Sequence, residues 1–344
     1  MMKEARYYRK ETGGARCTLC PHECKIPEGG RGLCRSRVCH EGRLYSEAYG
    51  RPCAMAIDPV EKKPLLHFHP GTEIFSLACT GCNFRCLNCQ NASISQTAPS
   101  ASMDEDVSPE GIISLCKSKG CRAIAFTYTE PLTYLEYIED IAVLAKAEGM
   151  ETVLVSAGYV NKEPLEDLLP YLDAANIDLK SFSDGLYSRL NGGSLGPVLE
   201  TLETLLARGV WLEITNLLIP GWNDDMGMIR DMCRWLKDKD FENCPLHFSR
   251  FWPAYRLQDV RPTPLRTLTA ARDIAREEGL RFVYIGNAPD CPDSEDTLCP
   301  SCGRTLIRRD GYRILENLAG GGRCPFCGAP IAGRFGALSG PTEA

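Results

Sequence analysis

Between residues 74 and 287, apolar runs of strand length alternate with amphipathic runs of helix length, and no other feature constrains the fold as strongly. The strand candidates are 74–80, 122–129, 151–157, 174–180, 211–220, 245–251 and 281–287. The helix candidates between them are 109–119, 133–148, 163–172, 196–208, 224–239 and 264–279. Repeated β–α units of this kind predict an α/β fold with a parallel sheet, either a partial or complete β/α barrel or an open doubly wound sheet. In both architectures the ligand lies at the carboxyl ends of the strands.

The 19 cysteines are the second informative feature, because most of them cluster at 17–39, 79–89 and 299–327. The N-terminal segment lacks the apolar region of a signal peptide, and no run of about 18 apolar residues occurs, so we expect a cytoplasmic protein without a membrane span. Cytosolic thiols are kept reduced, so clustered cysteines predict metal binding rather than disulfides. The remaining cysteines are expected to be small buried hydrophobic residues: Cys53, Cys116, Cys121, Cys233, Cys244 and Cys291.

The central group follows the first strand candidate, in "CTGCNFRCLNCQN" at residues 79–91. Cys82, Cys86 and Cys89 form a C-x-x-x-C-x-x-C motif, and Cys79 lies just upstream. Three thiolates from one loop can hold three irons of a [4Fe-4S] cluster and leave the fourth iron open to another ligand. A fourth ligand from Cys79 would instead give a closed electron-transfer cluster or a structural zinc site. The role of Cys79 therefore separates catalysis from structure.

The C-terminal group consists of two knuckles, "CPSCG" at 299–303 and "CPFCG" at 324–328. Zinc and iron both accept four thiolates in tetrahedral geometry, so the pattern leaves the metal open. A fold of roughly 35 residues, as expected for this module, needs its metal to be stable. The knuckles predict a zinc-ribbon or rubredoxin-like site with these ligands: Cys299, Cys302, Cys324 and Cys327.

The N-terminal group has the spacing C-x-x-C-x-x-x-C-x9-C at Cys17, Cys20, Cys24 and Cys34, with Cys39 nearby. Four thiols in so short a segment predict another metal-bound module, with either zinc or an auxiliary iron–sulfur cluster. His67 and His69, in the lead-in that follows, are expected to have surface or packing roles, with the mouth of the active site as the alternative. His247, on a later strand, is expected to be structural, with a role in acting on the substrate as the alternative. The predicted organisation is a Cys-rich module and lead-in at 1–73, a β/α domain at 74–290 and a C-terminal module at 291–344.

The central motif is similar to the signature of the radical S-adenosylmethionine (radical SAM) enzymes, in which this loop follows the first strand of a β/α barrel. The wider loop, "GCNFRCLNCQN", resembles that of relatives of the pyruvate formate-lyase activating enzymes, in particular the radical SAM member of the AmmeMemoRadiSam system. The resemblance implies a partial six-unit β/α radical SAM barrel with small Cys-rich metal-binding modules at both termini. Besides the terminal CPxCG pair, it is carried in order by "CTLCPHECKIPEGGRGLCRSR", "DPVEKKPLLHFHPG", "YTEPLTYLEY", "NIDLKSF", "LEITNLLIPGWND" and "LHFSRFWPAYRL".

By this resemblance, Cys82, Cys86 and Cys89 bind a [4Fe-4S] cluster, and S-adenosylmethionine (SAM) chelates the fourth iron through its amino and carboxylate groups. Reductive cleavage of SAM then yields a 5′-deoxyadenosyl radical that removes a hydrogen atom from a substrate. Cys79 falls outside the triad and is expected to be a bystander at the strand end. The family usually has an aromatic residue just before the third cysteine, where this chain has Asn88.

The resemblance also places SAM contacts at the ends of other strands. Glu130, in "TYTEP", is expected to accept a hydrogen bond from the SAM ammonium. Asp178 and Lys180, in "NIDLKSF", resemble the family's Asp-x-Lys, in which the lysine faces the SAM carboxylate. Two charges in an otherwise apolar run are also hard to bury without partners. Ser156 on one strand, and Glu213, Thr215 and Asn216 on another, are candidates either for contacts to the SAM ribose or substrate, or for polar interior positions of the barrel.

The predicted function is a radical SAM enzyme that abstracts hydrogen from an unidentified small molecule or partner protein. The alternatives are a glycyl-radical activase, which requires a large partner enzyme with a glycine loop, and a non-catalytic zinc-binding interaction protein. Expected partners are an external electron donor such as flavodoxin or ferredoxin and, by the subfamily's association, Memo-like and AMMECR-domain proteins. The net charge of −6 creates no basic field that would indicate nucleic acid or anionic lipid as a partner.

Overall fold

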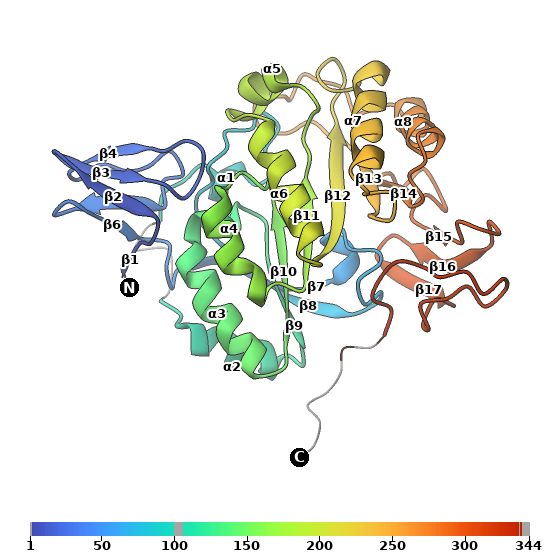
Figure 1. Cartoon of the computed structure of the whole chain (residues 1–344), viewed down its shortest axis with the longest axis horizontal. Helices are drawn as coiled ribbons and strands as arrows, with labels where there is room; N and C mark the ends of the chain where they lie inside the picture. The colour runs from blue at the N-terminus through green and yellow to red at the C-terminus, as the bar shows by residue number, and fades with distance from the viewer. Residues whose placement is uncertain (1, 100–105, 337, 339–344) are drawn as a thin grey trace.

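The computed structural model describes residues 2–99, 106–336 and 338, and its centre is an eight-stranded sheet in the order β14-β13-β12-β11-β10-β9-β8-β7 (Figure 1). The strands from β8 to β14 pair in parallel and follow one another in sequence order. The predicted parallel sheet is thus confirmed, with every expected strand present. These strands are β8 (Glu73–Cys79), β9 (Ala123–Phe126), β10 (Glu151–Ser156), β11 (Ala174–Asp178), β12 (Trp211–Leu218), β13 (Leu246–Arg250) and β14 (Val283–Gly286).

One edge of the sheet was not expected from the sequence. β7 (Pro52–Pro59) pairs antiparallel with β8, so the sheet extends upstream of residue 74 into the predicted lead-in. The residues of β7 are mostly half-buried or exposed, as befits an edge strand, and they lack the continuous apolar run that marks the inner strands. No strand pairing within the described ranges joins β7 to β14, so the strand order is open at both ends.

A helix follows each of the strands β8 to β13 and connects it to the next one (Figure 1). Capping signals set the helix starts: the Ser108 hydroxyl accepts a hydrogen bond from Gly111 N (3.2 Å), and Asp225 accepts one from Met228 N (2.8 Å). The predicted helix at 163–172 ends earlier and continues as a 3₁₀ turn that contains Pro170. The connecting helices are α2 (Pro109–Ser118), α3 (Leu135–Ala147), α4 (Lys162–Leu168), α6 (Gly196–Ala207), α7 (Met226–Asp238) and α8 (Leu265–Glu277).

Small β-structures lie at the two ends of the molecule in Figure 1. The N-terminal part contains two three-stranded sheets, β2-β3-β4 and β1-β6-β5. The C-terminal part is a third, β15-β16-β17. Their strands are β1 (Lys3–Glu4), β2 (Tyr8–Glu11), β3 (Gly14–Cys17), β4 (Lys25–Pro27), β5 (Arg37–His40), β6 (Arg43–Ser46), β15 (Thr297–Leu298), β16 (Thr305–Asp310) and β17 (Arg313–Asn317).

Buried side chains tie the C-terminal part to the central sheet. His67 is fully buried and bonds through Nδ1 to Ala332 O (2.6 Å), while His69 Nδ1 bonds to Gly336 O (2.5 Å). Both histidines therefore have the packing role that was predicted. Among the isolated cysteines, Cys116, Cys121, Cys233 and Cys244 are buried, as expected, whereas Cys53 and Cys291 are half-buried. No helix in the described part of the chain is both long and apolar enough to span a membrane.

Candidate functional site

A cavity of about 730 Å³ lies at the carboxyl ends of the parallel strands. Its volume falls within the range of small-molecule sites in proteins. The loops after β8, β9, β10 and β11 bring most of the predicted site residues to its wall, although these residues are far apart in the sequence. They are Cys82, Cys86, Cys89, Glu130, Ser156, Asp178 and Lys180.

The three cysteines of the motif are half-buried and belong to one loop. Backbone hydrogen bonds hold this loop against the segment before α6: Arg85 N donates to Asn191 O (2.7 Å), and Leu87 N donates to Leu190 O (2.9 Å). The amide of Asn191 also donates to Cys86 Sγ (3.1 Å). The loop is thus fixed before any cofactor binds, which favours a preformed metal site.

The spacing of these thiols fits a cluster better than a single ion. Sulfurs that share one tetrahedral zinc lie about 3.8 Å apart, from Zn–S bonds of about 2.3 Å. The sulfurs of Cys82, Cys86 and Cys89 do not all lie within 4.8 Å of one another. Ligands of an iron–sulfur cluster bind separate irons and are therefore spread more widely. Cys79 is fully buried in the core at the end of β8 and is not among the lining residues, and its place outside the cluster triad stays a prediction.

Glu130 is the most deeply buried carboxylate of the predicted SAM site, with 1% of its surface exposed. Its oxygens accept hydrogen bonds from Ser156 Oγ (2.7 Å), Ala157 N (2.9 Å) and Leu132 N (3.2 Å). Burial raises the pKa of Glu130, and these hydrogen bonds and Lys180 oppose the shift. Ser156 therefore orients Glu130, in addition to lining the cavity.

Lys180 and Asp178 form an ion pair at the cavity wall, with Lys180 Nζ 2.7 Å from Asp178 Oδ2. Burial lowers the pKa of Lys180, but Asp178 and the nearby Cys86 more than offset this effect and raise it above its usual value. The ammonium therefore stays charged at physiological pH. The hydroxyl of Tyr187 accepts a hydrogen bond from Lys180 N (3.0 Å) and fixes the backbone of this turn.

Asn216 is placed differently from the other predicted SAM ligands. It is 2% exposed, donates to Leu179 O (2.5 Å) and is not among the residues that line the cavity. This position agrees with the alternative of a polar interior residue. Its neighbour Thr215 does line the cavity and donates to Asn176 Oδ1 (2.9 Å). His247 also lines it, with Nε2 bonded to the buried Glu213 carboxylate (2.7 Å).

Asn88, which replaces the family's usual aromatic residue, lines the cavity. Phe84 lies in the same loop but is fully buried, with its ring centroid 4.9 Å from that of Tyr159. A Cβ on Gly193 would lie only 2.3 Å from the Phe84 ring. Phe84 therefore packs against Tyr159 beneath the loop, and it also lines the cavity.

Part of the cavity wall could not be expected from any motif. Glu61 lies on a single 3₁₀ turn (Val60–Lys62), and Glu295 and Tyr312 come from the C-terminal part of the chain. Burial raises the pKa of both Glu61 and Glu295. No spacing signal links these residues to the cysteine loop, because tertiary packing alone brings them to the cavity.

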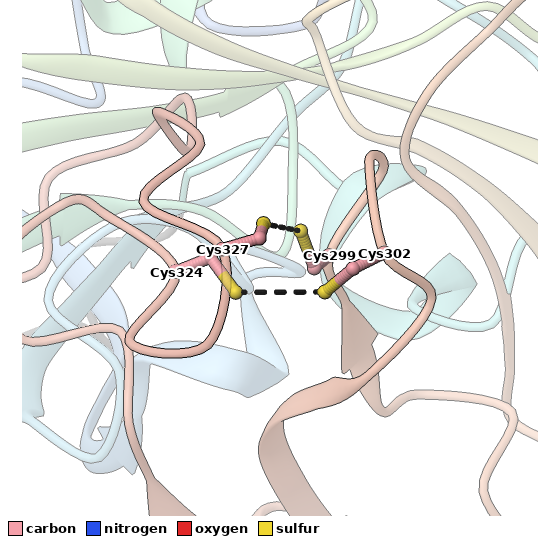
Figure 2. Close-up of side chains that lie close together, drawn as sticks. All are labelled: Cys299, Cys302, Cys324 and Cys327. Carbon is pink, nitrogen blue, oxygen red and sulfur yellow. Dashed lines mark hydrogen bonds between the residues drawn. The ribbon is translucent and has the colours of Figure 1, made fainter.

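The four C-terminal cysteines form a preorganised site for one tetrahedral ion. The Cys299 and Cys327 sulfurs are 3.6 Å apart, and those of Cys302 and Cys324 are 3.7 Å apart (Figure 2). These distances match the separation of about 3.8 Å expected around zinc. The knuckle glycines Gly303 (φ +72°) and Gly328 (φ +75°) adopt the left-handed backbone that their tight turns require. Among the described residues, this is the group of three or more cysteine, histidine or acidic side chains that could hold a metal ion directly.

The N-terminal cysteines also converge, but on a different kind of space. The side chains of Cys17, Cys20, Cys24 and Cys34 line one small cavity of about 20 Å³. No three of their sulfurs lie within 4.8 Å of one another. These cysteines therefore surround a space instead of meeting at a point.

The chain is similar in sequence to a known protein family and to several known proteins. The family model described as "Radical SAM superfamily" matches residues 77–234. The chain is 44% identical to the "Uncharacterized protein MJ0808" of Methanocaldococcus jannaschii, over 96% of this chain and 99% of that protein. It is 26% identical to the pyruvate formate-lyase 1-activating enzyme of Escherichia coli K12, over 59% of this chain and 89% of the enzyme. Among solved structures, a radical SAM methyltransferase from Sphaerobacter thermophilus aligns with a TM-score of 0.49 and 14% identity, over 69% of this chain and 71% of that one.

Proposed function

Because the chain belongs to the radical SAM superfamily, we propose that it is an enzyme that cleaves SAM reductively and uses the resulting radical to abstract a hydrogen atom from a substrate. The observation that carries this proposal is the convergence of three thiols, a buried carboxylate and a lysine ammonium on one cavity. They are Cys82, Cys86, Cys89, Glu130 and Lys180. In this proposal a [4Fe-4S] cluster with SAM bound supplies the radical chemistry, and the chain supplies ligands, orientation and exclusion of water.

Each of these side chains has a defined task in the proposal. The thiolates of Cys82, Cys86 and Cys89 hold the cluster, because their loop is fixed and their sulfurs are spread too widely for one ion. Glu130 accepts a charge-assisted hydrogen bond from the SAM ammonium. Lys180 faces the SAM carboxylate, and Asp178 keeps the Lys180 ammonium charged and in place.

The decisive experiment is anaerobic reconstitution of the full chain with iron and sulfide. A broad visible absorption that SAM perturbs, together with 5′-deoxyadenosine formed under reduction, is the expected result. A protein that binds only zinc and shows no such absorption would contradict the proposal and support the non-catalytic alternative.

A glycyl-radical activase is the second candidate, and the likeness to named activating enzymes favours it. That likeness covers 59% of this chain for the E. coli enzyme and 51% for the (2S)-3-sulfopropanediol dehydratase activating enzyme of Klebsiella oxytoca. In this chain, Glu295 and Tyr312 from the C-terminal part also line the cavity. Appearance of a glycyl radical in a partner enzyme, detected by electron paramagnetic resonance (EPR), would favour the activase over a small-molecule enzyme.

The finer assignment extends the proposal to the termini and to partners. We propose a radical SAM barrel flanked by two metal-binding modules, with zinc (or iron) on the C-terminal cysteines. The sequence motifs support membership of the AmmeMemoRadiSam type, with Memo-like and AMMECR-domain partners and a flavodoxin or ferredoxin as electron donor. Co-purification with tagged candidate partners tests this assignment, and an absence of any stable or catalytic coupling would contradict it.

A further inference from the structure

The N-terminal cysteines have a feature that their spacing alone did not reveal, namely that they enclose an internal cavity. Cys17 ends β3, Cys20 and Cys24 lie in the loop before β4, and Cys34 precedes β5. All four side chains line the same small cavity of about 20 Å³. Cys39 belongs to the same module and is buried, yet it is not among the lining residues. The cavity is thus built from a specific subset of the thiols.

The arrangement differs from the single-ion site at the other end of the same chain. The C-terminal sulfurs already lie 3.6 and 3.7 Å apart in two pairs, which suits one shared ion. In the N-terminal group no three sulfurs come within 4.8 Å of one another. Four thiolates spread around a central space suit a polynuclear iron–sulfur core, in which each binds its own iron.

A buried cation also faces this cavity. Arg37 lines it, is 1% exposed, and has an Nε without a hydrogen-bond partner among the described residues. Its Nη1 lies 4.0 Å from Cys17 Sγ, and its Nη2 donates to Glu136 (2.5 Å). An unpartnered buried guanidinium N–H is costly, so Arg37, which lines the same cavity as the four thiols, has a donor for which the described residues provide no acceptor. A cluster with four thiolate ligands is anionic and has sulfurs that accept such hydrogen bonds.

The cavity lies directly behind the cysteine loop of the proposed active site. Cys82 N donates to Cys34 O (3.2 Å), and the Ser36 hydroxyl donates to Thr80 O (3.1 Å). A Cβ at Gly81 (φ +104°) would lie 2.2 Å from Ser36 Oγ and 2.5 Å from Cys34 O, so only glycine allows this approach. A single backbone hydrogen bond therefore links Cys34 of the N-terminal group to Cys82 of the active-site loop.

We propose that Cys17, Cys20, Cys24 and Cys34 bind a second [4Fe-4S] cluster, which passes electrons to the cluster on Cys82, Cys86 and Cys89. The claim that these four cysteines bind a cluster rests on the geometry of the N-terminal module. The claim that this cluster passes electrons to the active site, which we call the relay, rests on the function proposed above. In the relay, a low-potential one-electron donor protein of the flavodoxin or ferredoxin class reduces the N-terminal cluster by one electron. That cluster is reoxidised as it passes the electron to the active-site cluster, which is reduced from the 2+ to the 1+ state.

Acid-labile sulfide separates the cluster from the alternatives, because neither zinc nor a rubredoxin-type iron contains it. The full chain with Cys82→Ala, Cys86→Ala and Cys89→Ala should still bind about four irons and about four sulfides after anaerobic reconstitution. The unmodified chain should bind about eight of each. Zinc without sulfide in the triple variant would overturn the second cluster. The function proposed above would survive that outcome if the unmodified chain still held about four sulfides and cleaved SAM.

The relay has its own test in the variant Cys20→Ser/Cys24→Ser, with Cys39→Ala as the matched control from the same module. SAM cleavage driven by reduced flavodoxin should be lost in the double variant and kept in the control. Cleavage driven by dithionite should be kept in both. Should the double variant fail to fold, the unmodified chain still provides a readout, since two reduced clusters this close should show a spin-coupled EPR signal. Flavodoxin-driven cleavage at the normal rate in the double variant, or uncoupled signals in the unmodified chain, would overturn the relay.

Discussion

The Ser156 hydroxyl donates a hydrogen bond of 2.7 Å to the Glu130 carboxylate across two neighbouring strand ends. The second carboxylate oxygen is held by Ala157 N at 2.9 Å. An ionised carboxylate in this position has lost its hydration but has a fixed orientation toward the cavity. Such preorganisation favours a cationic group of a ligand, because the carboxylate need not reorganise when the ligand binds.

The first prediction concerns SAM affinity. Glu130→Gln should weaken SAM binding by about 10- to 150-fold, which corresponds to about 1.5–3 kcal/mol for a hydrogen bond to a charged group. Iron content should not change, because Glu130 is not a cluster ligand. Ser156→Ala, the control, should have a smaller effect, about 0.5–1.5 kcal/mol, since it removes only an orienting bond. Isothermal titration under anaerobic conditions measures both, and equal affinity in the Glu130 variant and the unmodified chain would refute the assignment.

The second prediction concerns stability and pH. Burial raises the folded-state pKa of Glu130 above its unfolded value, so the folded protein favours the protonated carboxyl. This contribution to the free energy of unfolding is fully present below the unfolded pKa of about 4.3 and is lost as pH rises through the folded pKa. Without SAM, the stability of the unmodified chain relative to Glu130→Gln should therefore fall as the pH rises from acid to neutral, because only the unmodified chain has a carboxyl group to ionise at this position. Thermal unfolding of the two proteins across pH tests this, and a stability difference that does not change with pH would contradict it.

The third prediction concerns the ion pair of Lys180 and Asp178. Lys180→Met should weaken SAM binding by about 10- to 150-fold without loss of iron, since it removes the cation assigned to the SAM carboxylate. Asp178→Asn is the matched comparison, because it leaves the ammonium in place and removes only its partner. The lysine variant should thus be the more impaired of the two. If the aspartate variant lost more affinity, Asp178 and not Lys180 would be the contact.

The family resemblance singled out Glu130 and Lys180, and strand geometry accounts for their convergence. Parallel strands bring their carboxyl ends to one edge, and both residues follow such strand ends and line the cavity there. Asn216 was a candidate on the same reasoning, but it lies outside the cavity lining. A strand alternates its faces, so of the neighbouring candidates Thr215 and Asn216 only one side chain can point toward the cavity, and the structure shows that it is Thr215.

Other parts of the site depend on packing between segments that no local pattern connects. Glu61 and Glu295 reach the same cavity from opposite ends of the chain. The edge strand β7 is half-exposed and lacks a continuous apolar run. The cysteine spacings predicted which cysteines belong together, but they did not indicate how far apart the sulfurs lie. The structure shows that the sulfurs of the Cys299 group lie within 4.8 Å of one another, whereas no three sulfurs of the Cys17 group do.

The fourth prediction concerns the choice of cluster ligands. Cys82→Ala, Cys86→Ala and Cys89→Ala should each abolish reductive SAM cleavage, because each removes a ligand from the open cluster. Cys79→Ala should retain cleavage and lose about 0.5–3 kcal/mol of stability, as expected for a buried core residue. Quantification of 5′-deoxyadenosine gives the first result and thermal unfolding the second. Complete loss of the active-site cluster in the Cys79 variant would show that the wrong three cysteines were chosen.

The last prediction concerns the C-terminal cysteines, which could hold a metal and whose module contributes to the wall of the cavity. Arg309 lies within this module on β16 and donates to Leu66 O (2.7 Å) in the segment between β7 and β8, while Glu295 and Tyr312 line the cavity. Zinc has no redox chemistry, so on the zinc interpretation its loss should affect structure and not electron transfer. Cys302→Ser/Cys327→Ser should abolish metal binding at this site and loosen the module, because so small a fold depends on its metal. Chemically reduced enzyme should then still cleave SAM, but substrate turnover should fall as the wall is lost.

A protein purified from iron-replete anaerobic cells should carry about one zinc per chain at the C-terminal cysteines. A red rubredoxin-like chromophore that persists in the Cys82, Cys86 and Cys89 variants would instead identify iron, which can change oxidation state.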